Sequence, residues 1–263
     1  MVKAKKALGQ HFLKDLGIAR RIADSIESAN LPSGEASEWG ALPVVEVGPG
    51  MGVLSQFLIA NGRTVKAVEL DGESVAFLRN AFPDLDVTEG DFLKMDLDTL
   101  FPGEIVLIGN YPYNISSQIF FKVLENREKI PVVAGMLQKE VAQRICSAPG
   151  SKVYGILSVL LQAWYDCKYL FDVGPGVFAP PPKVTSGVIR LTRNGRETLG
   201  CDEAKFKMVV KTAFGQRRKT LRNSIGGLMG ADNPILSDPI MSERPERLGV
   251  DEFIRLTQAL PSK

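Results

Sequence analysis

Short apolar runs alternate with helical patterns from about residue 44 to residue 140. The apolar runs are rich in β-branched side chains, and most are followed by a segment with helical spacing. This alternation predicts a parallel sheet covered by helices on both faces, because crossovers between parallel strands place helices there. The predicted strands lie in PVVEV, TVKAVEL, LDVTEG, EIVLIGN and VVAGMLQ, and the predicted helices lie in GVLSQFLIANG, SVAFLRNAF and SSQIFFKVLENR.

The rest of the chain predicts the end of this sheet and then a helical region. YGILSVLLQAWYD has the pattern of a further helix, and KYLFDV and SGVIRLTR predict two closing strands around a proline-rich stretch. A polar stretch, TRNGRETLGCDEA, follows, and only helical patterns come after it, including EAKFKMVVKTAFGQRRKTLRNSIGGL. We therefore expect an α/β domain over residues 1–192 and a small all-helical C-terminal domain over residues 193–263.

Composition narrows the class of protein. The 32 Lys and Arg nearly balance the 30 Asp and Glu, so net charge alone identifies no partner. Three scattered cysteines and a single histidine, His11, argue against a disulfide framework or a metal site. No apolar stretch approaches the ~18 residues of a membrane span, and the basic N-terminus lacks the apolar core of a signal peptide. We expect a monomeric cytoplasmic protein without a metal.

A glycine loop directly follows the first predicted strand. Gly48, Gly50 and Gly52 in VVEVGPGMGVLS permit a tight turn and a close approach of the backbone to a ligand. A dinucleotide-binding fingerprint requires Gly-x-Gly-x-x-Gly, and its last glycine would stand at Val53. This departure weakens the interpretation as a nicotinamide-dinucleotide site.

Acidic residues follow the next two predicted strands. Glu69 lies about 20 residues past Gly48, where an acid accepts hydrogen bonds from the hydroxyls of a ribose. Asp91 ends the following strand and can accept a hydrogen bond from the amino group of an adenine ring. Recognition of a nucleoside without a pyrophosphate clamp predicts S-adenosyl-L-methionine as the cofactor.

The stretch VLIGNYPYNISS places an amide and two phenols at the end of a buried strand. The side-chain oxygen of Asn110 and the backbone carbonyl of Tyr111 can accept the two N–H bonds of an adenine amino group, which favours attack by its nitrogen. Pro112 restricts the turn, and Tyr113 can stack on the base. Behind an S-adenosylmethionine loop, this arrangement predicts methylation of the adenine N6 atom.

These motifs resemble those of the ribosomal RNA adenine N6,N6-dimethyltransferases. The likeness covers nearly the whole chain and includes LGQHFLKD, VVEVGPGMGVLS, NYPYNISS, LQKEVAQRI, FAPPPKVTSGVIRL, AFGQRRKTLRNSI and RPERLGVDEFIRL. It implies dimethylation of two adjacent adenosines in a hairpin loop near the 3′ end of 16S rRNA in the small ribosomal subunit, with a role in subunit biogenesis. The last two motifs resemble this branch more than the erythromycin-resistance branch, which modifies large-subunit RNA.

The resemblance also implies roles for individual residues. His11 and Leu13 would close over the cofactor, and Phe178 would be a second aromatic side chain against the target base, although it also suits an ordinary core position. Position 11 is often Asn in the family, and position 111 is usually Leu or Ile. The residues implied to contact the cofactor are His11, Leu13, Gly48, Gly50, Glu69, Asp91 and Asn110.

Basic residues cluster in the C-terminal region. Lys207, Lys211, Arg218 and Arg222 are spaced 4, 7 and 4 residues apart, which predicts one face of a helix, and Arg217 and Lys219 flank this stripe. Like charges in this number favour contact with RNA phosphates. For the N-terminal lysines at positions 3, 5 and 6, a solvated surface and an RNA contact are equally good interpretations.

Other functions also fit parts of the pattern. The alternatives are an adenine-N6 methyltransferase acting on 23S rRNA or on DNA, and a non-catalytic ribosome-assembly factor. The intact set of Gly48, Glu69, Asp91, Asn110 and Tyr113 argues against a factor without catalysis, and the C-terminal motifs argue against DNA.

Overall fold

The structure is a computed structural model that describes residues 2, 4–5, 8–27 and 39–261. The chain packs into two compact units. The first consists of Met1–Ala142 and Cys167–Arg193, and the second consists of Gln143–Asp166 and Asn194–Lys263. No helix in the described ranges is long and apolar enough to cross a membrane.

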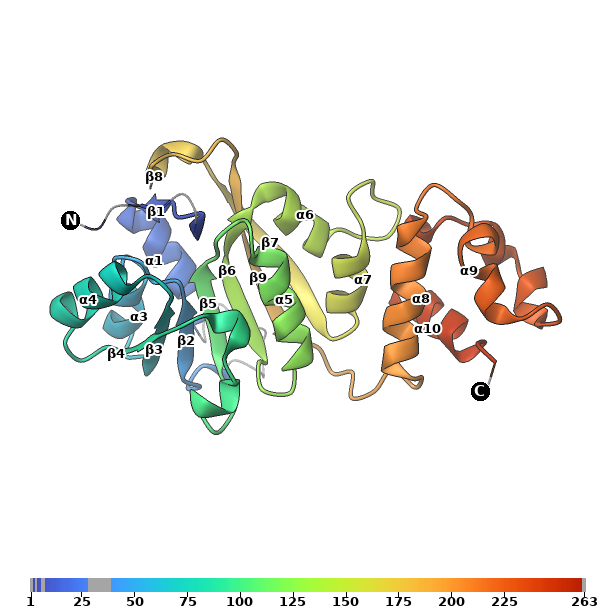
Figure 1. The fold of residues 1–263 in the computed structure, drawn as a ribbon, viewed down its shortest axis with the longest axis horizontal. Coiled ribbons are helices and arrows are strands. Elements are labelled where there is room, and N and C mark those ends of the chain that lie inside the picture. Colours follow the sequence, from blue (N-terminus) through green and yellow to red (C-terminus); the bar gives the residue numbers. More distant parts are fainter. Residues whose placement is uncertain (1, 3, 6–7, 28–38, 262–263) are drawn as a thin grey trace. The chain divides into compact units, whose positions relative to one another are not determined.

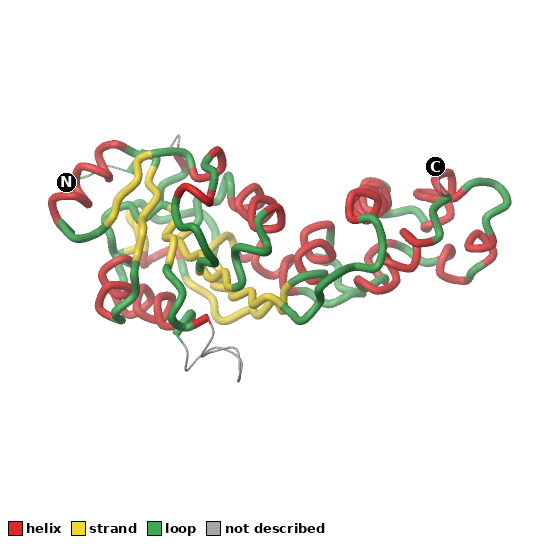
Figure 2. The backbone as a smooth tube through the Cα atoms, turned by 90° about the horizontal axis from the view of Figure 1, so that it is seen from below, coloured by secondary structure: helices red, strands yellow, loops and turns green. Residues whose placement is uncertain are grey.

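A seven-stranded mixed sheet forms the centre of the first unit (Figures 1 and 2). Five neighbouring strands are parallel, and β9 runs antiparallel to β6. The spatial order is β4 (Asp86–Glu89), β3 (Val65–Glu69), β2 (Val44–Val47), β5 (Val106–Asn110), β6 (Val132–Gln138), β9 (Ser186–Arg193) and β7 (Tyr165–Val173). The central strands β2 and β5 are buried along nearly their whole length, which explains why their sequences are apolar apart from Glu46 in β2 and Asn110 at the end of β5.

Helices cover the sheet because its strands expose apolar side chains on both faces. Helices α1 (Leu16–Asp24), α3 (Ser55–Ala60) and α4 (Gly72–Ala81) share a core with the even-numbered residues of β5 and β6. On the odd-numbered side, Phe120 of α5 (Ser116–Glu125) packs edge-on against Tyr111. Short 3-10 helices η3 (Phe92–Lys94), η4 (Leu97–Thr99) and η5 (Pro175–Val177) lie in the connections.

A separate two-stranded sheet joins the N-terminal segment to the proline-rich stretch. Strand β1 (Phe12–Leu13) runs antiparallel to β8 (Phe178–Ala179), and the Lys14 amide donates to the Val177 carbonyl at 2.8 Å. Two motifs separated by more than 160 residues in the sequence are therefore neighbours in the fold.

The second unit is helical and includes Gln143–Asp166, whereas the sequence predicts these residues in the first domain. Helix α6 (Lys139–Cys146) leads into it, and α7 (Ile156–Gln162) packs against α8 (Glu203–Gly215) and α10 (Val250–Gln258). The Phe214 ring contacts the rings of Tyr154 and Phe253, with centroids 6.2 and 5.9 Å apart. Its other elements are α9 (Leu221–Met229), η6 (Pro234–Ser237), η7 (Pro239–Ser242) and η8 (Pro245–Arg247).

The long helical pattern over residues 203–228 is divided into two helices, so the prediction of one continuous basic face is wrong. Helix α8 ends where Gln216 leaves helical geometry (φ −123°), and the extended Thr220 (ψ 159°) begins α9. The Lys219 amide closes the turn between them with a 2.8 Å hydrogen bond to the Gln216 carbonyl. Lys207 and Lys211 therefore lie on α8, Arg218 lies in the turn, and Arg222 lies on α9.

Candidate functional site

A cavity lies in the first unit at the carboxyl ends of parallel strands β2, β3 and β5, which is where open α/β sheets bind ligands. Four loops and the N-terminal segment form its wall. The lining residues are 8–13, 22, 46–51, 53–54, 68–70, 90–92 and 110–115.

The cavity brings together most of the residues predicted from the sequence. All seven predicted cofactor residues lie at its wall. Asn110, one of the seven, is also predicted to act on the base, and three more of the residues predicted to act on the base lie there too. The first group is His11, Leu13, Gly48, Gly50, Glu69, Asp91 and Asn110, and the second is Tyr111, Pro112 and Tyr113.

Phe178 is the exception, because the structure does not bring it to the cavity wall. Its residue is 1% exposed and belongs to the apolar core around α1. Phe178 lies on β8 opposite Leu13, and Leu13 lines the cavity. Phe178 therefore occupies the core position that the sequence left open as an alternative, and it packs beneath the strand β1 with which β8 pairs.

The glycine loop leaves room for a neighbouring side chain as well as for a ligand. Gly50 has a φ of 58°, which L-residues rarely adopt, and a Cβ at this position would lie 2.9 Å from the Phe12 ring. The N-terminal segment therefore packs directly on the loop, and this contact requires glycine.

Glu69 holds the glycine loop in place through both of its carboxyl oxygens. The Gly50 amide donates to Oε2 at 3.0 Å, and the Asp71 amide donates to Oε1 at 2.9 Å. Burial raises the pKa of Glu69, although these backbone hydrogen bonds oppose the shift. A carboxylate has about four lone-pair positions, so acceptor capacity remains for ligand hydroxyls.

Asp91 also combines a structural bond with exposure to the cavity. Its Oδ1 accepts from the Leu93 amide at 3.0 Å and so caps η3, while Oδ2 lies 3.6 Å from the Lys94 ammonium nitrogen. The side chain is 32% exposed, so it remains accessible to a ligand at the cavity wall.

The orientation of the Asn110 amide follows from one hydrogen bond. Its Nδ2 donates to the backbone carbonyl of His11 at 3.1 Å. A carbonyl can only accept, so this partner identifies the nitrogen end of the amide and leaves Oδ1 as the acceptor available to a ligand.

The side chain of Tyr111, which is larger than the Leu or Ile usual at this position, is held by packing in the core. Its hydroxyl donates to the Ala134 carbonyl at 2.8 Å, and the residue is 1% exposed. Its ring lies over paired glycines of β5 and β6, because a Cβ at Gly109 or Gly135 would come within 3.0 and 2.6 Å of it. The ring therefore belongs to the core. The group of Tyr111 that can accept a hydrogen bond from a ligand in the cavity is its backbone carbonyl.

Tyr113 is fixed by contacts to its hydroxyl and to its ring. The hydroxyl oxygens of Tyr113 and the fully buried Ser186 are 2.5 Å apart and share a hydrogen bond. The His11 ring stacks on the Tyr113 ring with centroids 5.7 Å apart, and His11 Nδ1 donates to the Pro180 carbonyl at 2.8 Å. His11 thus contacts the aromatic ring of the predicted base site as well as the cavity.

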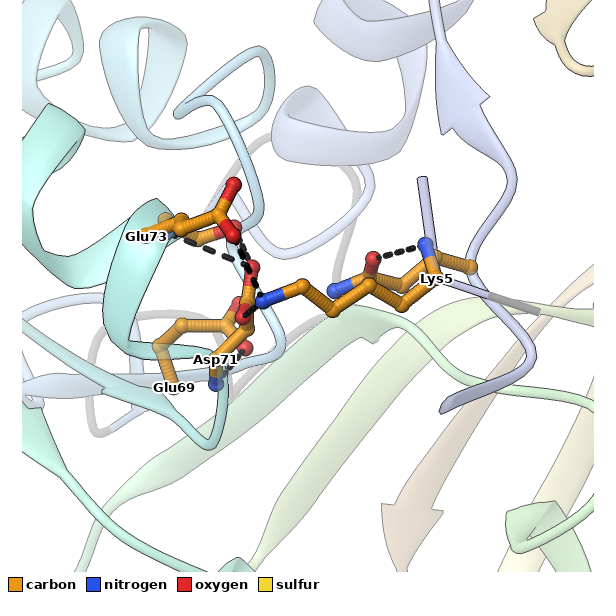
Figure 3. Close-up of polar contacts among 6 residues, drawn as sticks. Lys5, Glu69, Asp71 and Glu73 are labelled. Carbon is orange, nitrogen blue, oxygen red and sulfur yellow. Dashed lines mark hydrogen bonds and ion pairs between the residues drawn. The ribbon is translucent and has the colours of Figure 1, made fainter. Parts of the chain in front are cut away.

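Two acids that the sequence did not single out are Glu46, which lies at this site, and Asp71, which lies beside it and whose backbone amide donates to Glu69. Glu46 is 1% exposed in β2, accepts a 2.6 Å hydrogen bond from the Ser55 hydroxyl, and lines the cavity. Burial, together with the charge of Glu69, raises the pKa of Glu46 to about 7. A glutamate inside the apolar strand VVEV was the available signal. Asp71, which binds Lys5 (Figure 3), follows the predicted acid Glu69 and gave no comparable signal.

The predicted RNA-binding residues lie on the second unit in three different elements. Arg218, Lys219 and Arg222 are exposed, whereas Arg217 donates to the Lys152 carbonyl at 2.5 Å. Of the N-terminal lysines, those at positions 3 and 6 lie outside the described residues.

Known proteins similar to this chain match it over nearly its whole length. The model of a family described as ribosomal RNA adenine dimethylase matches residues 1–241. A Porphyromonas gingivalis protein named ribosomal RNA small subunit methyltransferase A is 60% identical over 263 residues, covering 98% of each chain. Its namesake from Cytophaga hutchinsonii is 52% identical, covering 100% of this chain and 99% of its own.

The chain belongs to the ribosomal RNA adenine dimethylase family. This confirms the resemblance that the motifs indicated.

Solved structures of related enzymes share the fold. A dimethyladenosine transferase from Plasmodium falciparum superposes with a TM-score of 0.76 at 23% identity, covering 94% of this chain and 96% of that one. The 23S rRNA methyltransferase ErmE superposes with a TM-score of 0.62 at 24% identity, covering 95% and 99%. The predicted Rossmann-like class I methyltransferase domain with a helical C-terminal part is confirmed.

The raised pKa of Glu46 predicts how stability depends on pH. Between pH 4.5 and about 7 the folded protein retains a proton that the unfolded chain has released, so stability falls as pH rises through this window. Glu46→Gln removes this titration. Its free energy of unfolding relative to that of the parent protein should therefore rise between pH 5 and pH 8 by up to about 3 kcal/mol, at 1.36 kcal/mol for each pKa unit.

Urea unfolding of the ligand-free protein at both pH values measures this difference. Substitution of the exposed Glu125 with Gln is the matched control and should show no such change. If the free energies of unfolding of Glu46→Gln and the parent differ by the same amount at pH 5 and at pH 8, the pKa of Glu46 is not raised in the folded protein.

Proposed function

We propose that this family member transfers methyl groups from S-adenosyl-L-methionine to 16S rRNA in the small ribosomal subunit. The products are N6,N6-dimethyladenosines at two adjacent positions in a hairpin loop near the 3′ end. Family membership and relatives named small subunit methyltransferase support this substrate. The observation that carries the chemistry is the orientation of Asn110, which presents an oxygen and not a nitrogen as its available group.

The acids of the cavity suit a cofactor of this kind. S-adenosyl-L-methionine supplies an electrophilic methyl group on a positively charged sulfonium. Glu46 and Glu69 are buried acids with raised pKa values, and a cationic ligand compensates the cost of ionising them. Glu69 would accept from ribose hydroxyls, Asp91 from the amino group of the cofactor's adenine, and the loop at Gly48 and Gly50 would admit the ligand to the backbone.

Asn110 and Tyr111 activate the target adenine by accepting hydrogen bonds from its amino group. The amino lone pair of free adenine is delocalised into the ring and is a poor nucleophile. Hydrogen bonds from its two N–H groups to Asn110 Oδ1 and to the Tyr111 carbonyl favour the tetrahedral nitrogen that attack requires. Pro112 holds the two acceptors in one turn, because its ring restricts the backbone.

Tyr113 holds the adenine ring for the second transfer. After one methylation a single N–H remains, so only one of the two acceptors can still be used. The position of the base then depends more on stacking. The Tyr113 ring is suited to this role because Ser186 fixes its hydroxyl and His11 covers one of its faces.

The second unit supplies contacts to RNA phosphates through Lys207, Lys211, Arg217, Arg218, Lys219 and Arg222. Its exposed basic residues around the turn between α8 and α9 are the best placed for this contact. An unpaired loop suits the enzyme, because an adenine outside a duplex enters a pocket at low cost. We further propose that the protein acts as a monomer in the cytoplasm.

Mapping of modified bases tests this function. The protein is incubated with labelled S-adenosylmethionine and small subunits that lack the modification, and the RNA is then digested and sequenced by mass spectrometry. Label in two adjacent dimethyladenosines near the 3′ end of 16S rRNA is expected. Label only in 23S rRNA or DNA would refute the proposed substrate, and absence of transfer would favour an assembly factor without catalysis.

Tyr113→Ala should slow the reaction and raise the proportion of monomethyladenosine. Removing the ring deletes stacking worth about 1–3 kcal/mol, on the scale for single-stranded bases, and the second transfer depends on it most. Mass spectrometry of the digested RNA gives the ratio of the two products. Tyr113→Phe, which keeps the ring and loses only the bond to Ser186, is the control and should stay close to the parent ratio. An unchanged ratio in Tyr113→Ala would show that stacking does not govern the second step.

Phe178→Ala separates stacking from core packing. Because Phe178 lies in the core, its loss should lower stability by about 3–5 kcal/mol. A changed product ratio in a fully stable Phe178→Ala protein would instead place this ring against the base.

Replacing Arg218 and Arg222 together with Gln should weaken RNA binding and reduce its dependence on salt. Each lost phosphate contact should lower the slope of log affinity against log salt by about 0.7 to 0.9. Filter binding at several salt concentrations measures the slope, and Arg196→Gln, which breaks an ion pair with Asp251, is a control elsewhere on the unit. An unchanged slope in the double variant would show that these arginines do not contact RNA.

A further inference from the structure

The N-terminal segment is defined as Lys5 together with residues 8–13, and residues 8–13 form one wall of the cavity. Its C-terminal end is fixed by the pairing of β1 with β8 and by the hydrogen bond from Asn110 to the His11 carbonyl. At its other end, Lys5 forms ion pairs with Asp71, the N-cap residue of α4, and with Glu73 in the first turn of that helix (Figure 3).

The partners of Lys5 are two acids that differ in burial. Its ammonium group binds Asp71, whose side chain is 2% exposed, and lies 3.1 Å from Glu73 Oε1, whose side chain is 60% exposed. Burial alone would raise the pKa of Asp71, but the hydrogen bonds from Lys5 and Ser74 outweigh burial and lower it. Without Lys5, the buried Asp71 carboxylate would lose its cationic partner.

This ion pair is adjacent to the cofactor acid. The amide of Asp71 donates to Glu69 Oε1, and the other Glu69 oxygen holds Gly50. Lys5 therefore fastens the N-terminal segment to the same turn that supports the predicted ribose-binding carboxylate.

Short contacts connect Lys5 to the rest of the segment. Its backbone amide donates to Gln10 Oε1 at 2.8 Å, and its carbonyl accepts from the Leu8 amide at 3.0 Å. Gly9 approaches Asn114 so closely that a Cβ there would lie 2.7 Å from Oδ1. The Phe12 ring covers Gly50. A segment held in this way contacts the glycine loop and the motif that follows β5.

We propose that Lys5 is a positioning residue that holds the N-terminal segment closed over the cofactor and so slows its release. The proposal rests on the proposed function in that the ligand is S-adenosylmethionine or its demethylated product. It also assigns Lys5 a role other than RNA contact, since its ammonium is already neutralised by two carboxylates. Lys5 acts on enclosure of the ligand, whereas Asn110 acts on the transfer step.

Binding of S-adenosylhomocysteine to the full-length protein tests the proposal. Lys5→Met keeps approximately the length of the side chain and removes its charge. It should raise both the dissociation constant and the dissociation rate of S-adenosylhomocysteine about tenfold, which lies between the effects of losing an exposed and a buried ion pair. Lys5→Arg should restore most of the affinity. Lys14→Met, at an exposed position after the segment, is the matched control and should bind like the parent. Calorimetry and stopped-flow displacement measure the two quantities.

Kinetics separate enclosure from chemistry and from general destabilisation. At saturating cofactor the Lys5→Met enzyme should methylate RNA within about twofold of the parent rate, so the loss appears in KM for the cofactor and not in kcat. In an Asp71→Asn background, Lys5→Met should cause a smaller further loss than in the parent, because the buried partner has lost its charge and only the exposed Glu73 remains. If Asp71→Asn does not fold, the Lys5→Met and Lys5→Arg measurements decide alone.

Each outcome has a distinct meaning. A parent protein that does not bind S-adenosylhomocysteine refutes the proposed cofactor. Normal affinity and dissociation rate in Lys5→Met, with the parent binding well, refute the role of Lys5. If Lys5→Met weakens only RNA binding, then Lys5 is a phosphate contact and the inference is overturned.

Discussion

The hydrogen bond from the Asn110 amide to the His11 carbonyl is the interaction on which the arrangement of the site depends. It joins the end of β5 to the N-terminal segment and sets which end of the amide faces a ligand. The same segment packs Phe12 on the glycine loop and the His11 ring on Tyr113. The residues proposed to bind the cofactor and those proposed to hold the base are therefore parts of one connected structure.

The cavity places carboxyl groups where their ionised forms are costly. Glu46 and Glu69 are each at most 5% exposed, and burial raises the pKa of both. A protein retains such groups where a ligand or partner compensates them. Within the first unit Asp71 already has its partner in Lys5. The positively charged cofactor that we propose would be the partner of the other two acids.

Local patterns in the sequence predicted the parts of the protein that depend on local physics. Strands buried on both faces, glycines at a tight turn and acids at strand ends have short-range signatures. The sheet was therefore predicted correctly, and most of the residues predicted for the site lie at the wall of one cavity. The division between α8 and α9 was missed, because Gln216–Thr220 has no proline and retains helical spacing. The ion pair of Lys5 with Asp71 and the core position of Phe178 depend on tertiary contacts between distant segments, for which the sequence offers no periodic pattern.

The rate of methyl transfer by Asn110→Ala in a single turnover, at saturating cofactor and with excess enzyme, tests the central claim most directly. The claim is that Asn110 Oδ1 accepts a hydrogen bond from an N–H group of the target amine. Loss of one such polarising group costs roughly 10²- to 10³-fold in rate, by analogy with oxyanion-hole donors. This decrease is expected in a folded protein saturated with cofactor, so that weaker cofactor binding caused by loss of the hydrogen bond to His11 does not limit the measured rate. A rate close to that of the parent enzyme would contradict the account.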